Sequence, residues 1–123
     1  MLTNFIMVAL GGALGSALRY ATLLGAARAF GPGLPLGTLA VNVLGSFAIG
    51  VAVFWLVGPR AWAHPLLVAG FLGGFTTFSA FSLDAFRLWE NGQPGLALSY
   101  VLGSVILSLA ALLAGLGLGR ALA

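Results

Sequence analysis

The sequence of 123 residues is poor in charge: only 6% of its residues are Asp, Glu, Lys or Arg, against about 25% in soluble domains. It has no cysteine, which excludes disulfide bonds and thiolate metal sites. It has no lysine, and its five basic residues are scattered arginines, which argues against a nucleic-acid-binding surface despite an isoelectric point near 10.8. Two carboxylates and one histidine are too few to build a hydrolytic or redox site, so we do not expect an enzyme.

Apolar residues are abundant instead, making up 61% of the chain with a mean hydropathy of +1.14. Such a composition predicts an integral membrane protein. Because a spanning helix takes about 20 residues, the length allows four spans and leaves no room for a soluble domain. We expect a single all-α domain over residues 1–123, with spans at about 5–27, 36–57, 66–89 and 96–118. The first apolar run lacks the basic start of a signal peptide and is counted as a span.

The third expected span contains an unusual stretch at its centre. Paired glycines, Gly73 and Gly74, are followed by two hydroxyl residues, Thr76 and Thr77, inside an otherwise apolar run. This pattern predicts a helix that is broken in the middle of the membrane. Irregular backbone at that depth persists only where it is buried in protein or lines a wet cavity. The stretch is therefore the candidate functional centre.

Two polar residues lie deep in the first two expected spans. Arg19 has long apolar stretches on both sides, so we interpret it as a functional residue rather than one that reaches the interface. Asn42 shares a helix face with Thr38, four residues earlier. For Asn42 two interpretations stay open: it joins helices by a hydrogen bond, or it lines a path.

The remaining polar and aromatic signals are weaker. After the expected break Phe78, Phe81 and Ser82 share a face, although an aromatic pair at helical spacing more often fills a core or faces lipid. A hydroxyl stripe follows in the fourth span, where serines can also bond back to their own helix; its members are Tyr100, Ser104 and Ser108. An ion-paired helix end is predicted where the spacing is i, i+3, i+6, at Asp84, Arg87 and Glu90.

The arginines near the span ends are balanced between the two sides of the membrane. Arg60 and Arg120 fall on one side, and Arg28 and Arg87 on the other. Since an excess of basic residues on one side normally sets orientation, we expect insertion in both directions and an antiparallel homodimer. In such a dimer the two helix breaks would meet near the midplane, and their exposed carbonyls would jointly hold a cation.

Three motifs, over residues 11–20 (GGALGSALRY), 37–47 (GTLAVNVLGSF) and 70–82 (GFLGGFTTFSAFS), together resemble the CrcB/Fluc family of fluoride channels. The resemblance covers most of the chain. It implies a dual-topology antiparallel homodimer in the cell inner membrane or plasma membrane, with two fluoride pores and a structural sodium ion on the dimer axis. The implied function is passive fluoride export, which lowers fluoride toxicity.

The resemblance also implies roles for particular residues. The backbone carbonyls of Gly73 and Thr76 match the positions that hold sodium. Ala80 departs from the family pattern, in which threonine is common. The implied fluoride pore comprises Asn42, Phe78, Phe81, Thr38, Ser79, Ser82, Tyr100, Ser104, Ser108 and Arg19. The alternative is a small dual-topology four-span drug exporter, which needs a membrane-embedded carboxylate where the first span offers Arg19.

Overall fold

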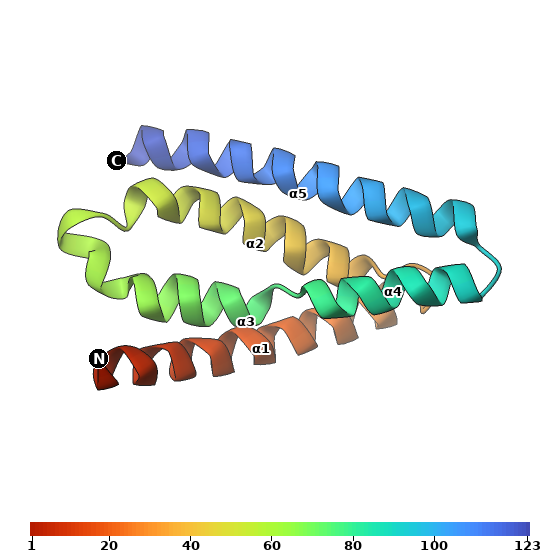
Figure 1. Ribbon diagram of the computed structural model, residues 1–123, viewed down its shortest axis with the longest axis horizontal. Helices are drawn as coiled ribbons and strands as arrows, with labels where there is room; N and C mark the ends of the chain where they lie inside the picture. Colours follow the sequence, from red (N-terminus) through yellow and green to blue (C-terminus); the bar gives the residue numbers. More distant parts are fainter.

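The computed structural model describes residues 1–123 and is entirely helical (Figure 1). Four helical stretches are long and apolar enough to cross a membrane, which confirms the predicted number of spans. The observed helices overrun the predicted spans at the two chain ends, because the prediction counted the residues a bilayer needs rather than where the helices end. In chain order the elements are α1 (Leu2–Phe30), α2 (Leu36–Trp55), η1 (Gly58–Ala63), η2 (Pro65–Leu72), α3 (Gly73–Phe75), α4 (Phe78–Glu90) and α5 (Pro94–Leu122).

The helices run roughly alongside one another, and the two termini lie at the same end of the molecule (Figure 1). The α2 helix packs along α5, and α1 packs along η2 and α3. The third span is therefore composite: η2, α3 and α4 follow one another in a line, with a short non-helical connection between α3 and α4 (Figure 1).

Glycines bring α2 and α5 into backbone contact. A Cβ atom added at Gly50 would lie 2.5 Å from the carbonyl oxygen of Leu112, and one added at Gly119 would lie 2.6 Å from that of Val51. A Cβ atom at Gly115 would collide with the carbonyl group of Phe47. Close packing of this kind drives helix association in lipid, where apolar burial alone gives no advantage.

The α1 helix approaches η2 and α3 in the same way. Added Cβ atoms on Gly11 and Gly15 would meet the backbones of Leu66 and Phe71, and one on Gly70 would lie 2.8 Å from the carbonyl oxygen of Val8. Gly11 and Gly15, one turn apart on α1, thus form a stripe of small residues that packs against the third span. Arg19 follows Gly15 by one turn of α1 and so lies on the side of this contact.

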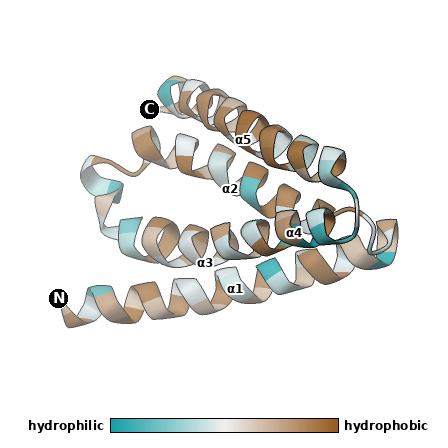
Figure 2. Ribbon diagram, turned by 45° about the vertical axis from the view of Figure 1, so that its right-hand side comes forward, coloured by the Kyte–Doolittle hydropathy of each residue, from teal (hydrophilic) through white to brown (hydrophobic).

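Most large apolar side chains lie on the outside of the molecule. Only 18 of 123 residues are buried, and exposed leucines, isoleucines and phenylalanines occur along every long helix. Hydrophobic residues cover most of the helices, while hydrophilic ones gather in the connecting segments, at helix ends and at a few single turns within α1 and α2 (Figure 2). An apolar exterior of this extent suits a surface that contacts lipid.

Candidate functional site

The helical backbone is interrupted at Thr76 and Thr77. Thr76 has φ −87° and ψ 160°, and Thr77 has φ −155° and ψ 122°, so both residues are extended. Gly73 and Gly74 are still helical, at the start of α3. Upstream, η2 is wound more loosely than an α-helix, and the Gly73 N–H donates to the carbonyls of Val68 and Gly70. The glycines therefore lie beside the extended pair rather than within it.

Asn42 of α2 binds the extended residues through both ends of its amide. Its Oδ1 accepts a hydrogen bond from the Thr77 N–H at 2.8 Å, and its Nδ2 donates to the Thr77 carbonyl at 3.0 Å. An isolated extended residue has no neighbouring strand, and Asn42 supplies the two bonds that a strand would give. Asn42 therefore joins α2 to the third span, and one Nδ2 hydrogen is left over for another acceptor.

Two further side chains satisfy backbone groups at the ends of the interruption. The Thr77 hydroxyl caps α4 by accepting a hydrogen bond from the Ala80 N–H at 3.1 Å. On the other side, Arg19 Nε donates to the Gly74 carbonyl at 3.0 Å. A cation at the carboxyl end of a helical segment also complements its dipole. Arg19 thus joins α1 to the backbone of α3 by a hydrogen bond.

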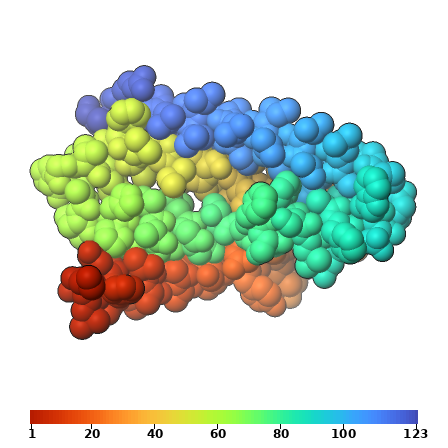
Figure 3. Space-filling model, in the orientation of Figure 1, coloured from red at the N-terminus to blue at the C-terminus, as the bar shows by residue number.

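A cavity of about 430 Å³ lies beside the interruption, bounded by α2, the third span and α5. It shows as a depression in which atoms of α2 are visible between α5 and the third span (Figure 3). Seven of the predicted site residues meet here: Asn42, Gly73, Thr76, Phe78, Phe81, Ser104 and Ser108. The other lining residues are Gly45, Ser46, Ile49, Val68, Leu72, Thr77 and Val105.

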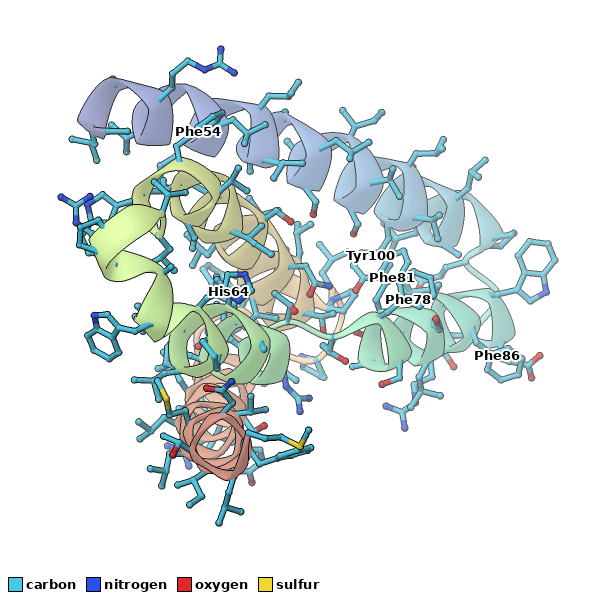
Figure 4. The ribbon with its side chains drawn as sticks, turned by 60° about the vertical axis from the view of Figure 1, so that its left-hand side comes forward. Phe54, His64, Phe78, Phe81, Phe86 and Tyr100 are labelled. Carbon is cyan, nitrogen blue, oxygen red and sulfur yellow. The ribbon has the colours of Figure 1, made fainter.

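Aromatic rings form one wall of this cavity and continue away from it. The ring centroids of Phe78 and Phe81 are 5.5 Å apart, and those of Phe81 and Tyr100 are 5.3 Å apart, with the planes tilted by 50° and 46°. The three labelled rings gather between α4 and α5, whereas Phe86 lies apart from them (Figure 4). Phe81 is only 8% exposed, but Phe78 is 78% exposed. Phe78 therefore presents its ring to the outside of the single chain.

Ser104 is the polar side chain of the cavity that has no partner. The residue is 5% exposed, and its Oγ is buried without a hydrogen bond. A buried hydroxyl in this condition costs about 1–3 kcal/mol unless something else accepts its hydrogen. Ser104 also lines the cavity, so its hydroxyl lies at the cavity wall.

Ser46 is a cavity residue that our sequence analysis missed. It lies four residues after Asn42 on α2, so both face the cavity from the same side of the helix. The i, i+4 spacing from Asn42 was the signal that would have found it. Ser104 and Ser108 have the same spacing on α5, opposite.

Five predicted pore residues do not line this cavity. Arg19 binds the α3 backbone, and Tyr100 lies behind Phe81. Ser79 and Ser82 are exposed on α4, and Ser82 donates its hydroxyl hydrogen to the Phe78 carbonyl of its own helix. Thr38 lines a second pocket of about 260 Å³ near the connection between α1 and α2.

The predicted ion-paired end of α4 is wrong. Neither Asp84 nor Glu90 forms an ion pair with Arg87; Asp84 Oδ2 instead accepts a hydrogen bond from the Tyr100 hydroxyl at 3.3 Å. The reason is the packing of α4 against α5, which turns Asp84 inward and leaves Arg87 and Glu90 exposed. Asp84 and Arg87 both line the second pocket, together with Thr38.

A cation would have to be held by backbone oxygens, because no group of three or more His, Cys, Asp or Glu side chains comes together. Two backbone carbonyl oxygens beside the interruption fit this role. In an uninterrupted helix the Thr77 N–H would bond to the Gly73 carbonyl and the Ala80 N–H to the Thr76 carbonyl. Both N–H groups are diverted to side chains, to Asn42 and Thr77 respectively. Two carbonyl oxygens that suit a hard cation are thereby released.

The fold and this cavity define a multi-pass integral membrane protein in which three of the four spans bound a cleft beside an interrupted helix. Residues 6–116 match the family model described as "CrcB-like protein, Camphor Resistance (CrcB)". The chain belongs to the CrcB family.

Curated relatives resemble the chain over almost its whole length. A protein of Cereibacter sphaeroides is 55% identical over 120 residues, covering 98% of this chain and 97% of the relative. One of Paracoccus denitrificans is 56% identical over 121 residues, covering 97% and 96%. One of Agrobacterium fabrum is 52% identical over 121 residues, covering 95% and 96%. Each is named "Fluoride-specific ion channel FluC".

Proposed function

We propose that the chain is a fluoride-selective, passive ion channel that releases fluoride from the cytoplasm across the cell membrane and so lowers fluoride toxicity. Its relatives carry the name of that activity. The structural observation that carries the proposal is Ser104, whose buried hydroxyl lacks a partner beside the cavity that Asn42 also lines. The relatives' name gives no support to the alternative, a drug exporter.

The cavity offers the kind of groups that a small, strongly hydrated anion requires. Fluoride must exchange its water for hydrogen-bond donors, and Ser104 and the second Nδ2 hydrogen of Asn42 are free to donate. Phenyl rings contribute as well, since their edges carry the positive part of the ring quadrupole. Phe78 and Phe81 present rings at the cavity wall. The site binds and transfers an anion without bond making, so we propose a channel rather than an enzyme.

The functional unit that we propose is an antiparallel homodimer whose two-fold axis lies in the membrane plane. Phe78, which is 78% exposed at the rim of an open cavity, suits a contact with a second copy. Equal numbers of arginines at the two ends, Arg28 and Arg87 against Arg60 and Arg120, favour insertion in both orientations. The extended pair Thr76–Thr77 would then lie near the bilayer midplane in both copies.

We also propose a structural sodium ion at the dimer axis, held by the carbonyl oxygens of Gly73 and Thr76. One chain supplies two such oxygens and an antiparallel pair supplies four, which together replace more of an ion's hydration shell. When bound, the ion supplies a fixed positive charge among converging carbonyl dipoles. The chain's own part is to keep these oxygens out of helical hydrogen bonds.

The experiment that tests the function compares two serine variants on α5. Purified protein is placed in liposomes loaded with potassium fluoride, and fluoride efflux is followed with an ion-selective electrode after a potassium ionophore is added. Ser104→Ala should slow efflux about 10- to 100-fold, because a hydrogen bond to an ion is worth about 1.5–3 kcal/mol. Ser99→Ala is the control, since Ser99 is exposed and bonds to Gly95 of its own helix. Equal efflux from both variants would remove Ser104 from the pathway.

A further inference from the structure

Two side-chain contacts release two carbonyl oxygens around the interruption. Asn42 Oδ1 takes the Thr77 N–H at 2.8 Å, the group that would bond to the Gly73 carbonyl in a continuous helix. Thr77 Oγ1 takes the Ala80 N–H at 3.1 Å, which would bond to the Thr76 carbonyl. Extended backbone alone does not achieve this, because a released N–H can return to its carbonyl when the chain relaxes. The two side chains hold the N–H groups away.

The Gly74 carbonyl, in the same stretch, is not released but accepts a hydrogen bond from a side chain. Arg19 Nε donates to it at 3.0 Å, so this oxygen is occupied by a protein cation rather than released. The side chains therefore distinguish between neighbouring carbonyl oxygens. Those of Gly73 and Thr76 are free of their helical donors, whereas that of Gly74 is bonded to Arg19. The selecting side chains come from three different elements, α1, α2 and the interruption itself.

We propose that Asn42 and Thr77 are positioning residues for the cation: they hold the N–H groups that would otherwise occupy the Gly73 and Thr76 carbonyl oxygens. This inference rests on the proposed function, because it needs the sodium ion. It assigns Asn42 a role distinct from donating to fluoride. The acceptor atom Oδ1 serves the cation site, and the remaining Nδ2 hydrogen serves the anion path.

Two substitutions of Asn42 distinguish its role at the cation site from its role in the fluoride path. Asn42→Asp keeps an acceptor oxygen for the Thr77 N–H but loses the amide donor, so it should keep sodium binding and lose fluoride flux. Asn42→Leu loses both atoms at similar volume, so the Thr77 N–H is released to the Gly73 carbonyl and sodium binding should weaken. Loss of a group that supports a metal ligand typically lowers metal affinity about 10- to 100-fold.

Thr77 allows the same comparison with a smaller change. Thr77→Val keeps the shape but removes the oxygen that holds the Ala80 N–H, whereas Thr77→Ser keeps the oxygen. Thr22→Val is the matched control, because the Thr22 hydroxyl is exposed and bonds to Leu18 of its own helix. A folding defect caused by removing a threonine hydroxyl in general would then show in Thr22→Val as well.

The measurement is the sodium-dependent rise in melting temperature of the purified dimer in detergent, in sodium chloride against N-methyl-D-glucamine chloride at equal ionic strength. A ligand that binds only the folded state raises its stability with ligand concentration. The sodium concentration for the half-maximal rise should increase about 10-fold or more in Thr77→Val and Asn42→Leu. It should stay at the parent value in Thr77→Ser and Thr22→Val, and it should not increase in Asn42→Asp, whose added negative charge favours a cation.

Two results would count against the inference, and they are distinguishable. If the parent protein shows no sodium-dependent rise in melting temperature, the proposed sodium site is refuted, and with it the positioning roles of Asn42 and Thr77. If the parent shows the rise and Thr77→Val and Asn42→Leu show it at the same sodium concentration, the inference alone is overturned. Should Asn42→Leu fail to fold, the Thr77→Val and Thr77→Ser pair decides by itself.

Discussion

A pair of glycine substitutions on α5 tests the packing that holds the molecule together. Gly115 faces α2, where an added Cβ atom would collide with the carbonyl group of Phe47. Gly117, two residues further on, has nothing within 4 Å of an added Cβ atom. Both glycines are helical and both would become alanine, so the two variants differ only in what the new methyl group meets.

The expected difference follows from two terms. Alanine favours a helix over glycine by up to about 1 kcal/mol, and this gain is common to both variants. Overpacking costs about 1–3 kcal/mol, and it applies to Gly115→Ala alone. We expect the upper end of that range, because the obstructing atoms at Gly115 belong to the backbone of α2 and cannot rotate away as a side chain would.

Equilibrium unfolding of the purified protein in mixed detergent micelles, with increasing sodium dodecyl sulfate, measures this difference. Gly117→Ala should unfold at the same or a slightly higher denaturant fraction than the parent. Gly115→Ala should be less stable than Gly117→Ala by about 3 kcal/mol. Equal stability of the two variants would mean that α2 and α5 do not meet at Gly115. It would also contradict the described position of the cavity between these helices.

Further predictions concern the path and the orientation. Phe78→Ile and Phe81→Ile should each reduce fluoride efflux from liposomes with the dimer intact, since isoleucine keeps much of the bulk but lacks a ring edge; efflux like the parent's from both folded variants would refute the aromatic wall. Asn42→Asp should reduce efflux further because a carboxylate repels an anion, and acidification that protonates it should restore flux; efflux that stays low at acidic pH would indicate misfolding instead. Tags at the carboxyl terminus should be cleaved by protease from both sides of the membrane, whereas cleavage from one side only would rule out dual topology.

The four spans were predictable because a long apolar run can be recognised from its length and hydropathy without knowledge of its packing partners. Thr76 and Thr77 were also marked in the sequence, since paired glycines and hydroxyls are foreign to a plain spanning helix. The sequence placed the irregularity over residues 73–77, whereas the backbone is extended only at the two threonines. Local pattern locates such a feature to within about one helical turn, as it does for helix ends.

The partners of individual side chains were not predictable. Asn42 bonds to a residue 35 positions away, and Arg19 to one 55 positions away, so neither bond has a local signal. For Asn42 the sequence left two interpretations open, joining helices or lining a path; the structure shows the hydrogen bond and also places Asn42 at the cavity. Asp84 shows the converse failure. Its local spacing favoured an ion pair, and packing against α5 gave it Tyr100 instead.

The measurement that tests the central claim most directly is the relative passage of fluoride and chloride through the parent protein. Liposomes containing the purified chain are loaded with both potassium salts, and the two anions are followed with separate electrodes after a potassium ionophore is added, with protein-free liposomes as the control. A fluoride-selective channel should give rapid fluoride efflux and chloride efflux close to the control. Equal efflux of both anions, or none of either, would contradict it.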